Sequence, residues 1–234
     1  MSKPAIVIPV LEPSYRLVDY VRGLFTRGFQ KVIIVNDGSG PAFEPVFDQL
    51  RAFDGCTVLV HDRNRGKGRA LKTAFEEYIR QGWYNDYCGV ITADGDGQHT
   101  LADVVKISRV MELRPDALIL GERDLKNGVP VKSRIGNGAS AFMYRVLFRT
   151  KLRDSQTGLR GIPNHLLSPL STLAGERYEY EMNMLMYCTT HRHPMVGTRI
   201  STVYYDYNQN SHFKPFKDTV RLHFMMFRTK MKNL

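Results

Sequence analysis

Short apolar runs rich in β-branched residues recur through the first half of the chain and alternate with amphipathic segments. Such runs are typical of strands buried on both faces, and the segments between them carry apolar residues at helical spacing. Strands that alternate with helices of about ten to fifteen residues form βαβ units, whose strands lie parallel in one sheet. The alternation therefore predicts an α/β fold, with a mostly parallel central sheet and helices on both faces.

Individual elements follow from the same patterns. The predicted strands cover residues 5–10, 31–35, 57–60, 89–93, 117–120 and 196–205. The predicted helices cover residues 16–27, 43–53, 70–79, 102–113, 139–148 and 179–187. Residues 61–68 are expected to form a polar, basic loop, and residues 154–158 a polar turn.

Charge and composition narrow the range of partners. The 234 residues carry 33 Lys and Arg against 23 Asp and Glu, a formal net charge of +10. This excess favours nucleic acid, an anionic membrane surface or a phosphorylated small molecule as partner. The three cysteines lack the spacing of a zinc site or a disulfide framework, which suits a reducing cytoplasm. No stretch has the length and apolarity of a membrane span, so we expect a soluble protein or one bound to a membrane surface.

Two carboxylates, one residue apart, follow the fourth predicted strand in the run Thr-Ala-Asp-Gly-Asp-Gly-Gln-His, residues 92–99. Mg²⁺ and Mn²⁺ take oxygen ligands and are commonly held by one or two carboxylates together with substrate phosphates. Asp94 and Asp96 therefore predict a site for a metal-bound diphosphate. The alternative is an ordinary turn, because Asp and Gly dominate turns for local reasons.

Polar residues also follow the neighbouring strands, at Glu12, Asp37 and residues 64–67. Ligands bind at the carboxyl ends of the strands in open parallel sheets. These segments are expected to converge with Asp94 and Asp96 on one edge, which favours the ligand site over the turn. Neither the glycines of residues 38–43 nor those of residues 64–68 complete a dinucleotide fingerprint or a P-loop, so neither class of enzyme is favoured.

Charged side chains later in the chain offer further candidates. Arg123 and Arg134 lie in a polar, basic segment after the fifth predicted strand. Guanidinium groups fork onto phosphate oxygens and stabilise a leaving diphosphate, although an exposed arginine can also be merely solvated. Asp154 is either a functional carboxylate or the cap of its turn.

The last part of the chain, residues 214–234, interleaves Lys and Arg with aromatic and aliphatic residues. This composition is typical of an amphipathic helix on anionic lipid. The alternative is a C-terminal helix that packs on the body of the protein and keeps a solvated basic face.

Six motifs stand in a fixed order along the chain: Ile-Pro-Val-Leu-Glu (8–12), Val-Asn-Asp-Gly-Ser (35–39), Asn-Arg-Gly-Lys-Gly-Arg-Ala-Leu (64–71), Asp-Gly-Asp-Gly-Gln-His (94–99), Gly-Glu-Arg (121–123) and Asp-Ser-Gln-Thr-Gly-Leu-Arg (154–160). Together they resemble family 2 glycosyltransferases of the GT-A fold, in the branch of dolichyl- and polyprenyl-phosphate sugar synthases. The resemblance covers most of the chain, and the order and spacing of the motifs are more specific than any one of them. The resemblance implies a GT-A catalytic domain over residues 1–210 and a basic amphipathic segment over residues 211–234 that contacts the membrane surface.

The resemblance also implies roles for single residues. Those expected to bind the nucleotide sugar are Pro9, Glu12, Asp37, Lys67, Asp94 and Gly95. Those expected to hold Mg²⁺ or Mn²⁺ are Asp94, Asp96 and Gln98. Those expected to act in catalysis, including contacts to the acceptor phosphate and the leaving group, are Asp96, Gln98, Arg123, Arg134 and Asp154.

The implied reaction is an inverting, metal-dependent transfer of a hexose from a nucleotide-diphosphate sugar to a polyprenyl phosphate, by a peripheral protein on the cytoplasmic membrane face. A hydroxyl acceptor in cell-envelope polysaccharide synthesis is the alternative, and it would require a general base, for which Asp154 is the candidate. A nucleotidyltransferase of similar fold is a further alternative. A basic nucleic-acid-binding module is disfavoured because no recognition-helix, zinc-finger or RNA-binding motif is present. A homo-oligomer or a separate membrane-protein partner is left open.

Overall fold

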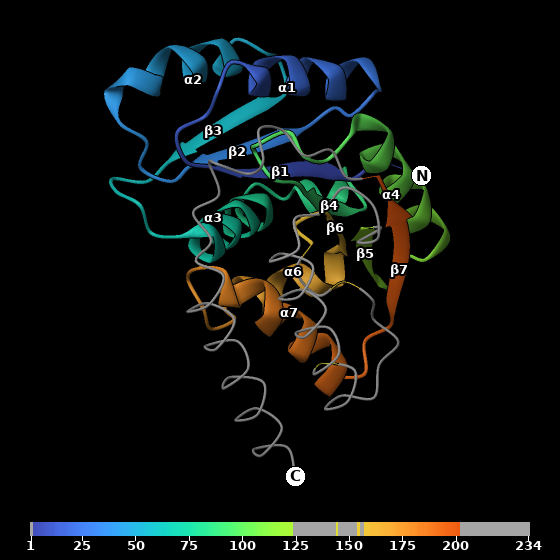
Figure 1. Ribbon diagram of the computed structural model, residues 1–234. Coiled ribbons are helices and arrows are strands. Elements are labelled where there is room, and N and C mark those ends of the chain that lie inside the picture. The colour runs from blue at the N-terminus through green and yellow to red at the C-terminus, as the bar shows by residue number, and fades with distance from the viewer. Residues whose placement is uncertain (1, 124–143, 145–153, 155–156, 202–234) are drawn as a thin grey trace.

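The computed structural model describes residues 2–123, 144, 154 and 157–201. These residues form a seven-stranded sheet in the order β3-β2-β1-β4-β6-β5-β7, with helices on both faces (Figure 1). The strands are β1 (Ala5–Val10), β2 (Val32–Asn36), β3 (Cys56–Val60), β4 (Gly89–Thr92), β5 (Leu118–Arg123), β6 (Arg160–Pro163) and β7 (Met195–Ile200). The helices are α1 (Arg16–Thr26), α2 (Glu44–Arg51), α3 (Lys67–Arg80), α4 (Leu101–Leu113), α6 (Asn164–Ser171) and α7 (Glu179–Thr190), with short 3₁₀ turns at Pro41–Phe43 and Trp83–Asn85.

The predicted α/β fold with a mostly parallel sheet is confirmed. Strands β3, β2, β1 and β4 pair in parallel, and β5 pairs in parallel with the edge strand β7. Only β6 runs against its neighbours within the described sheet, where it joins β4 to β5. The carboxyl ends of the six other strands therefore point to one edge of the sheet.

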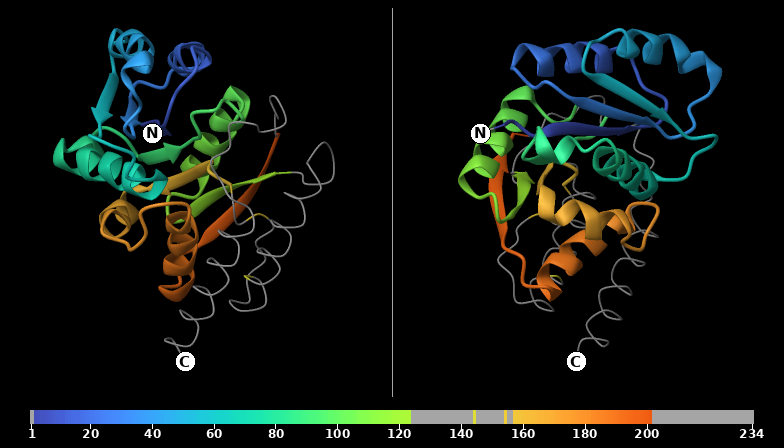
Figure 2. Two further views of the ribbon diagram at one scale, coloured as in Figure 1. Left: turned by 60° about the vertical axis from the view of Figure 1, so that its left-hand side comes forward. Right: turned by 180° about the vertical axis from the view of Figure 1, so that it is seen from behind.

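Successive side chains of a strand point to opposite faces of the sheet, so the apolar core forms two layers, one on each face. In β1, Ile6 and Ile8 pack with α1, α2 and α4 on one face, and Ala5 and Val7 pack with α3, α6 and α7 on the other. Figure 2 shows these helices on opposite sides of the sheet. Because both faces are covered, the central strands read as continuous apolar runs. Full burial of each Ile or Val contributes about 1.5–3 kcal/mol.

The main differences from the prediction lie near the end of the described sheet. No element was predicted over β6 or α6, because β6 has only four residues and α6 contains Pro169, which disturbs a helical pattern. Helix α3 begins at Lys67, so the predicted loop is two residues shorter than expected. Gly68 therefore lies inside α3 and not in the loop. A Cβ on Gly68 would lie 2.5 Å from the Tyr180 Cβ, so glycine is needed there because the first turn of α3 packs against the start of α7.

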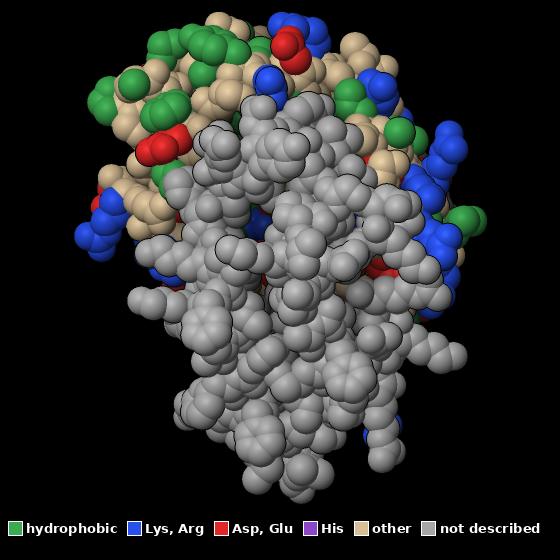
Figure 3. Space-filling view, viewed as in Figure 1, with side chains coloured by type: hydrophobic (Ala, Val, Ile, Leu, Met, Phe, Trp, Pro, Cys, Tyr) green, Lys and Arg blue, Asp and Glu red, His purple; other side chains and the backbone are tan. Residues whose placement is uncertain are grey.

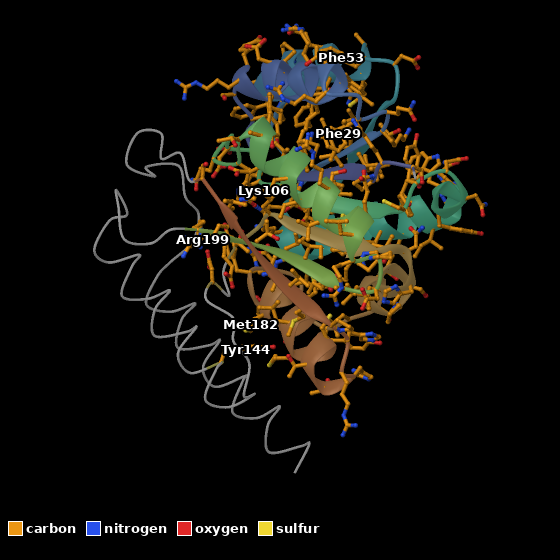
Figure 4. The ribbon with its side chains drawn as sticks, turned by 90° about the vertical axis from the view of Figure 1, so that its right-hand side faces the viewer. Phe29, Phe53, Lys106, Tyr144, Met182 and Arg199 are labelled. Carbon is orange, nitrogen blue, oxygen red and sulfur yellow. The ribbon has the colours of Figure 1, made fainter. Side chains whose placement is uncertain are left out.

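Several predictions fall outside the described residues: the helix over residues 139–148 apart from Tyr144, the end of the last strand and the segment 211–234. Tyr144 itself is buried, and its hydroxyl donates to the Leu185 carbonyl of α7 at 2.8 Å; Figure 4 shows it below the sheet near Met182. Across the part of the chain that the structure describes, every helix is too short or too polar to span a membrane.

Candidate active site

The polar segments that follow β1, β2, β3 and β4 meet at the carboxyl edge of the sheet, as predicted. The Asp37 backbone N–H donates to the Val10 carbonyl at 2.8 Å, which joins the ends of β2 and β1. The loop after β3 folds back onto Asp37, and its last residue before the helix is Gly66. The next residue, Lys67, reaches the carboxylate that follows β4.

Asp94 is the centre of this edge. Its Oδ1 lies 2.6 Å from the Lys67 ammonium, and its Oδ2 lies 3.0 Å from His99 Nε2. Burial alone would raise the pKa of Asp94, but the charge of Lys67 and then the His99 contact outweigh it and hold the pKa well below its usual range. The carboxylate is therefore ionised and already stabilises a cation, the ammonium group of Lys67.

The antiparallel strand β6 helps to set the position of Asp94. In the register of β4 and β6, Thr92 lies opposite Arg160. The Thr92 hydroxyl donates to the Gly158 carbonyl at 2.7 Å, which ties the segment before β6 to the end of β4. Asp94 follows two residues after Thr92, just beyond the end of β4, and its carboxylate packs against Gly158.

Asp96 is more exposed than Asp94. Its Oδ1 accepts a hydrogen bond from the Gln98 backbone N–H at 3.0 Å, which shapes the loop after β4. Desolvation by surrounding atoms and then the negative charge of Asp94 raise the pKa of Asp96. The loop ends where the Thr100 hydroxyl accepts from the Asp103 N–H at 3.1 Å and caps α4.

The residues at this edge fit a divalent cation that is shared with a diphosphate. Two carboxylates repel each other here, and a cation beside both would relieve that repulsion. Among the described residues, the buried side-chain atoms without a hydrogen-bond partner are His99 Nδ1, Glu181 Oε1 and Tyr20 OH. All three groups are connected with Asp94. His99 contacts Asp94 directly, and Glu181 contacts Lys67, which in turn contacts Asp94. Burial raises the pKa of Tyr20, and the negative charge of Asp94 raises it further.

No group of three or more His, Cys, Asp or Glu side chains within the described ranges is arranged to hold a metal by itself. Mg²⁺ and Mn²⁺ do not require such a group when substrate phosphates and water complete the coordination shell. The metal roles predicted for Asp94, Asp96 and Gln98 stay predictions.

Asp37 holds the loop between β3 and α3. Its Oδ1 accepts from the Arg65 N–H at 2.9 Å and its Oδ2 from the Gly66 N–H at 2.8 Å. His61 Nδ1 lies 2.7 Å from the same Oδ1, and all of these groups are near the start of α3. The contacts give Asp37 a structural role beside the nucleotide-binding role predicted for it.

Glu12, Pro9 and Gly95 lie at the end of β1 and beside it. Glu12 is exposed and has a φ of 54°, an uncommon conformation for a residue other than glycine, and its N–H donates to the Ser39 hydroxyl at 2.9 Å. A Cβ on Gly95 would lie 3.3 Å from the Pro9 carbonyl oxygen, so the loop after β4 runs directly against β1. The structure thus brings the predicted nucleotide-sugar residues together at one edge.

Arg123 and Asp154 form an ion pair at the end of β5. Arg123 Nε donates to Asp154 Oδ2 at 2.6 Å, and Arg123 Nη2 donates to Oδ1 at 3.1 Å. The Asp154 side chain has 0% exposure and that of Arg123 has 14%. Sequence reasoning placed both residues in the site without pairing them. Arg134, the remaining predicted catalytic residue, lies outside the described residues.

Sequence reasoning assigned no role to His99 or Glu181. His99 stands in the motif of residues 94–99, so its position five residues after Asp94 was a usable signal. Glu181 was predicted only as part of a core helix, and nothing in the local sequence connects it with Lys67, which is 114 positions earlier.

The sequence model of glycosyl transferase family 2 matches residues 6–166, which include the strand ends and the Asp94 loop. The chain belongs to this family. The enzyme is therefore a glycosyltransferase, and its sheet and helices follow the GT-A type of fold. The residues that meet around Asp94 lie where an open parallel sheet binds its ligand.

Two similar proteins match this chain over most of its length and over most of their own. One is a UDP-N-acetylglucosamine–dolichyl-phosphate N-acetylglucosaminyltransferase of Methanococcus voltae, 24% identical over 222 residues, with 87% of this chain and 86% of that protein covered. The other is the protein MJ1222 of Methanocaldococcus jannaschii, 26% identical over 211 residues, with 88% of this chain and 83% of that protein covered.

Solved structures show the same fold at low sequence identity. S. aureus TarS 1–349 in complex with UDP-GlcNAc has a TM-score of 0.56 and 13% identity, and the match covers 96% of this glycosyltransferase and 66% of that chain. GalNAc-T7 with UDP, GalNAc and Mn²⁺ has a TM-score of 0.54 and 12% identity, with 95% and 48% covered. The glycosyltransferase thus spans less than two thirds of the length of these chains.

Proposed function

We propose that this glycosyltransferase moves a sugar from a UDP-sugar to a polyprenyl phosphate, with inversion at the anomeric carbon and with a divalent cation on the diphosphate. The observation that carries the proposal is the pair of carboxylates Asp94 and Asp96 after β4, beside the Lys67 ammonium, at the ligand-binding edge of a family 2 fold. Asp94, Asp96 and Gln98 would hold the cation, which offsets charge on the leaving diphosphate.

The donor and acceptor are proposed from the relative in Methanococcus voltae, whose name states UDP-N-acetylglucosamine and dolichyl phosphate, and which aligns over 87% of this chain. UDP-GlcNAc is therefore the first donor to test. The solved TarS complex contains the same donor in the same fold, which supports a UDP-sugar.

The Arg123–Asp154 pair favours a phosphate acceptor over a hydroxyl acceptor. A hydroxyl acceptor needs a general base, whereas a lipid phosphate is already ionised and can attack without one. The carboxylate that sequence reasoning offered as this base, Asp154, is buried, and both of its oxygens accept hydrogen bonds from the Arg123 guanidinium. A general base must instead reach the hydroxyl from which it takes a proton.

Membrane-surface contact is part of the proposal, since a polyprenyl phosphate lies in a bilayer. The basic segment 211–234 has the composition of an interfacial helix. Figure 3 shows Lys and Arg side chains on the flank formed by α4 and β7, and the exposed residues there include Lys106, Arg109 and Arg199. These charges would strengthen contact with an anionic leaflet. The face of the membrane would be the cytoplasmic one.

The test measures UDP release from UDP-GlcNAc with Mn²⁺ or Mg²⁺, with and without a polyprenyl phosphate. Lipid-dependent release that is lost in Asp96→Asn and kept in Asp116→Asn would support the proposal. Asp116 is a suitable control because it is an exposed carboxylate paired with Arg114, away from the strand ends that form the site. If UDP release does not depend on the lipid but increases with a saccharide acceptor, the acceptor is a hydroxyl group and not a polyprenyl phosphate.

A further inference from the structure

The Lys67 ammonium is shared between two carboxylates from different elements. It lies 2.6 Å from Asp94 Oδ1 and 3.0 Å from Glu181 Oε2. The side chain of Lys67 is 18% exposed and that of Glu181 is 9% exposed, so bulk water competes weakly with either contact. The ammonium thus occupies Asp94 Oδ1, one of the two oxygens through which Asp94 would bind the proposed divalent cation.

An ammonium and a divalent cation compete for Asp94 Oδ1, because their charges repel each other strongly in a partly buried site. Movement of Lys67 away from Asp94 therefore favours binding of a cation and its diphosphate. Its other partner, Glu181, is already within 3.0 Å of the ammonium. A short side-chain movement is sufficient to leave Lys67 with Glu181 and with the incoming phosphate oxygens.

Glu181 is anchored independently of Lys67. Its backbone carbonyl accepts a hydrogen bond from the buried Arg160 Nη1 at 2.6 Å. Arg160 belongs to β6, which pairs with β4, the strand that leads to Asp94. The backbone of Glu181 is thereby fixed relative to the strand that leads to Asp94, which keeps its carboxylate within reach of the ammonium.

The second oxygen of Glu181 has capacity for another hydrogen bond. Glu181 Oε1 is buried and has no partner among the residues that the structure describes. An unpaired buried carboxylate oxygen is unfavourable, and an ammonium released from Asp94 can donate to both oxygens of Glu181. The structure thus leaves an acceptor ready for Lys67.

From these contacts we propose that Glu181 is a positioning residue, which takes the Lys67 ammonium from Asp94 when the donor diphosphate and its cation bind. The inference rests on the proposed function, because it requires a nucleoside diphosphate and a divalent cation at Asp94. Without the Glu181 carboxylate, the ammonium has Asp94 as its remaining described acidic partner and competes harder with the cation. No covalent bond changes in this step.

The experiment measures Mn²⁺ binding to the full chain in the presence of UDP or GDP, by the electron paramagnetic resonance signal of free Mn²⁺. Neither sugar nor lipid is present, so the result is independent of turnover. Glu181→Gln is expected to weaken Mn²⁺ binding at least about fivefold, the lower range of coupling between binding sites. The same substitution is then made in a Lys67→Met background, which has no competing ammonium. There Glu181→Gln is expected to leave Mn²⁺ affinity equal to that of Lys67→Met alone.

Glu179→Gln is the matched control. It removes the same charge from the same turn of α7, and the described contacts of the Glu179 carboxylate are with the N–H groups of Glu176 and Arg177 at 3.4 Å. It is expected to bind Mn²⁺ as the wild type does. A structural role for Glu181 alone predicts instead that Glu181→Gln weakens Mn²⁺ binding equally in the wild-type and Lys67→Met backgrounds.

Three results would overturn the inference: wild-type affinity in Glu181→Gln, an equal loss of affinity when Glu181→Gln is added to Lys67→Met, or a wild type that binds no Mn²⁺ with either nucleotide. Failure of the proposed acceptor would appear differently. In that case the Mn²⁺ affinities of the variants in the presence of UDP would differ as expected, while sugar transfer to a polyprenyl phosphate would be absent.

Discussion

Gly158 lies against the Asp94 carboxylate so closely that a Cβ at this position would be 2.5 Å from Oδ1 and 2.4 Å from Oδ2. These distances are shorter than any normal contact between a methyl group and a carboxylate. Gly158 precedes β6, the antiparallel strand that inserts beside β4. The absence of a side chain at Gly158 therefore determines where the central carboxylate of the site can lie.

Gly158→Ala is expected to displace Asp94 and to reduce both Mn²⁺–UDP binding and sugar transfer at least about tenfold, equivalent to ~1.4 kcal/mol. Gly40→Ala is the control, because a Cβ on Gly40 would meet no atom within 4 Å. It should leave binding unchanged. If the two substitutions have equal effects on binding and transfer, the contact between Gly158 and Asp94 is not needed for either.

Asp154→Asn is expected to destabilise the fold by about 3 kcal/mol, because it leaves the Arg123 guanidinium partly buried without its carboxylate. Urea denaturation measures the change in the free energy of unfolding. Asp116→Asn, which breaks an exposed pair with Arg114, should leave that free energy nearly unchanged. Similar changes in the free energy of unfolding for both variants would show that the buried pair of Arg123 and Asp154 does not stabilise the fold.

Asp37→Ala is expected to cost about 2–4 kcal/mol, because the Arg65 and Gly66 N–H groups and the His61 ring lose their shared acceptor. Asp37→Asn should cost less, since its amide keeps one accepting oxygen. Thermal and urea unfolding measure both changes. The exposed neighbour Asp62 provides the control, and Asp62→Ala should be nearly neutral. A stable Asp37→Ala variant would mean that the loop before α3 does not depend on this carboxylate.

Stability is expected to fall as the pH rises above the usual pKa of a thiol, about 8.5. Burial raises the pKa of Cys188 to about 12 and that of Cys56 to about 11, with the charge of Lys31 opposing the shift at Cys56. The native state therefore retains thiol protons that the unfolded state loses. Each such thiol lowers the free energy of unfolding by up to about 1.4 kcal/mol per pH unit above that pKa.

Urea denaturation between pH 8 and pH 10 measures this slope, and Cys56→Ser should reduce it. Slow reaction of the native thiols with a disulfide reagent at pH 8, followed by rapid reaction in urea, would agree with the same shifts. A slope that is the same in Cys56→Ser as in the wild type would contradict the assignment to Cys56.

Local sequence patterns were sufficient for the α/β class and for strands β1 to β4. Strands β1, β2 and β4 are almost fully buried, so their apolar runs are unbroken, and turn residues mark where each run ends. The edge strand β3 is only partly buried, but its residues are also mostly apolar. The same reasoning located Asp37 and Asp94, since a parallel sheet brings the ends of its strands to one edge. The resemblance of the motifs then added the family, which the match over residues 6–166 confirms.

The sequence by itself thus determined the strand–helix alternation, the family and the edge at which the polar strand ends meet. Only the tertiary structure decided that β6 runs antiparallel beside β4, that Arg123 pairs with Asp154, and that Lys67 joins Asp94 to Glu181. The physical reason is separation along the chain. Periodicity reports on neighbours within a few positions, whereas Lys67 and Glu181 meet because α3 and α7 pack on the same face of the sheet.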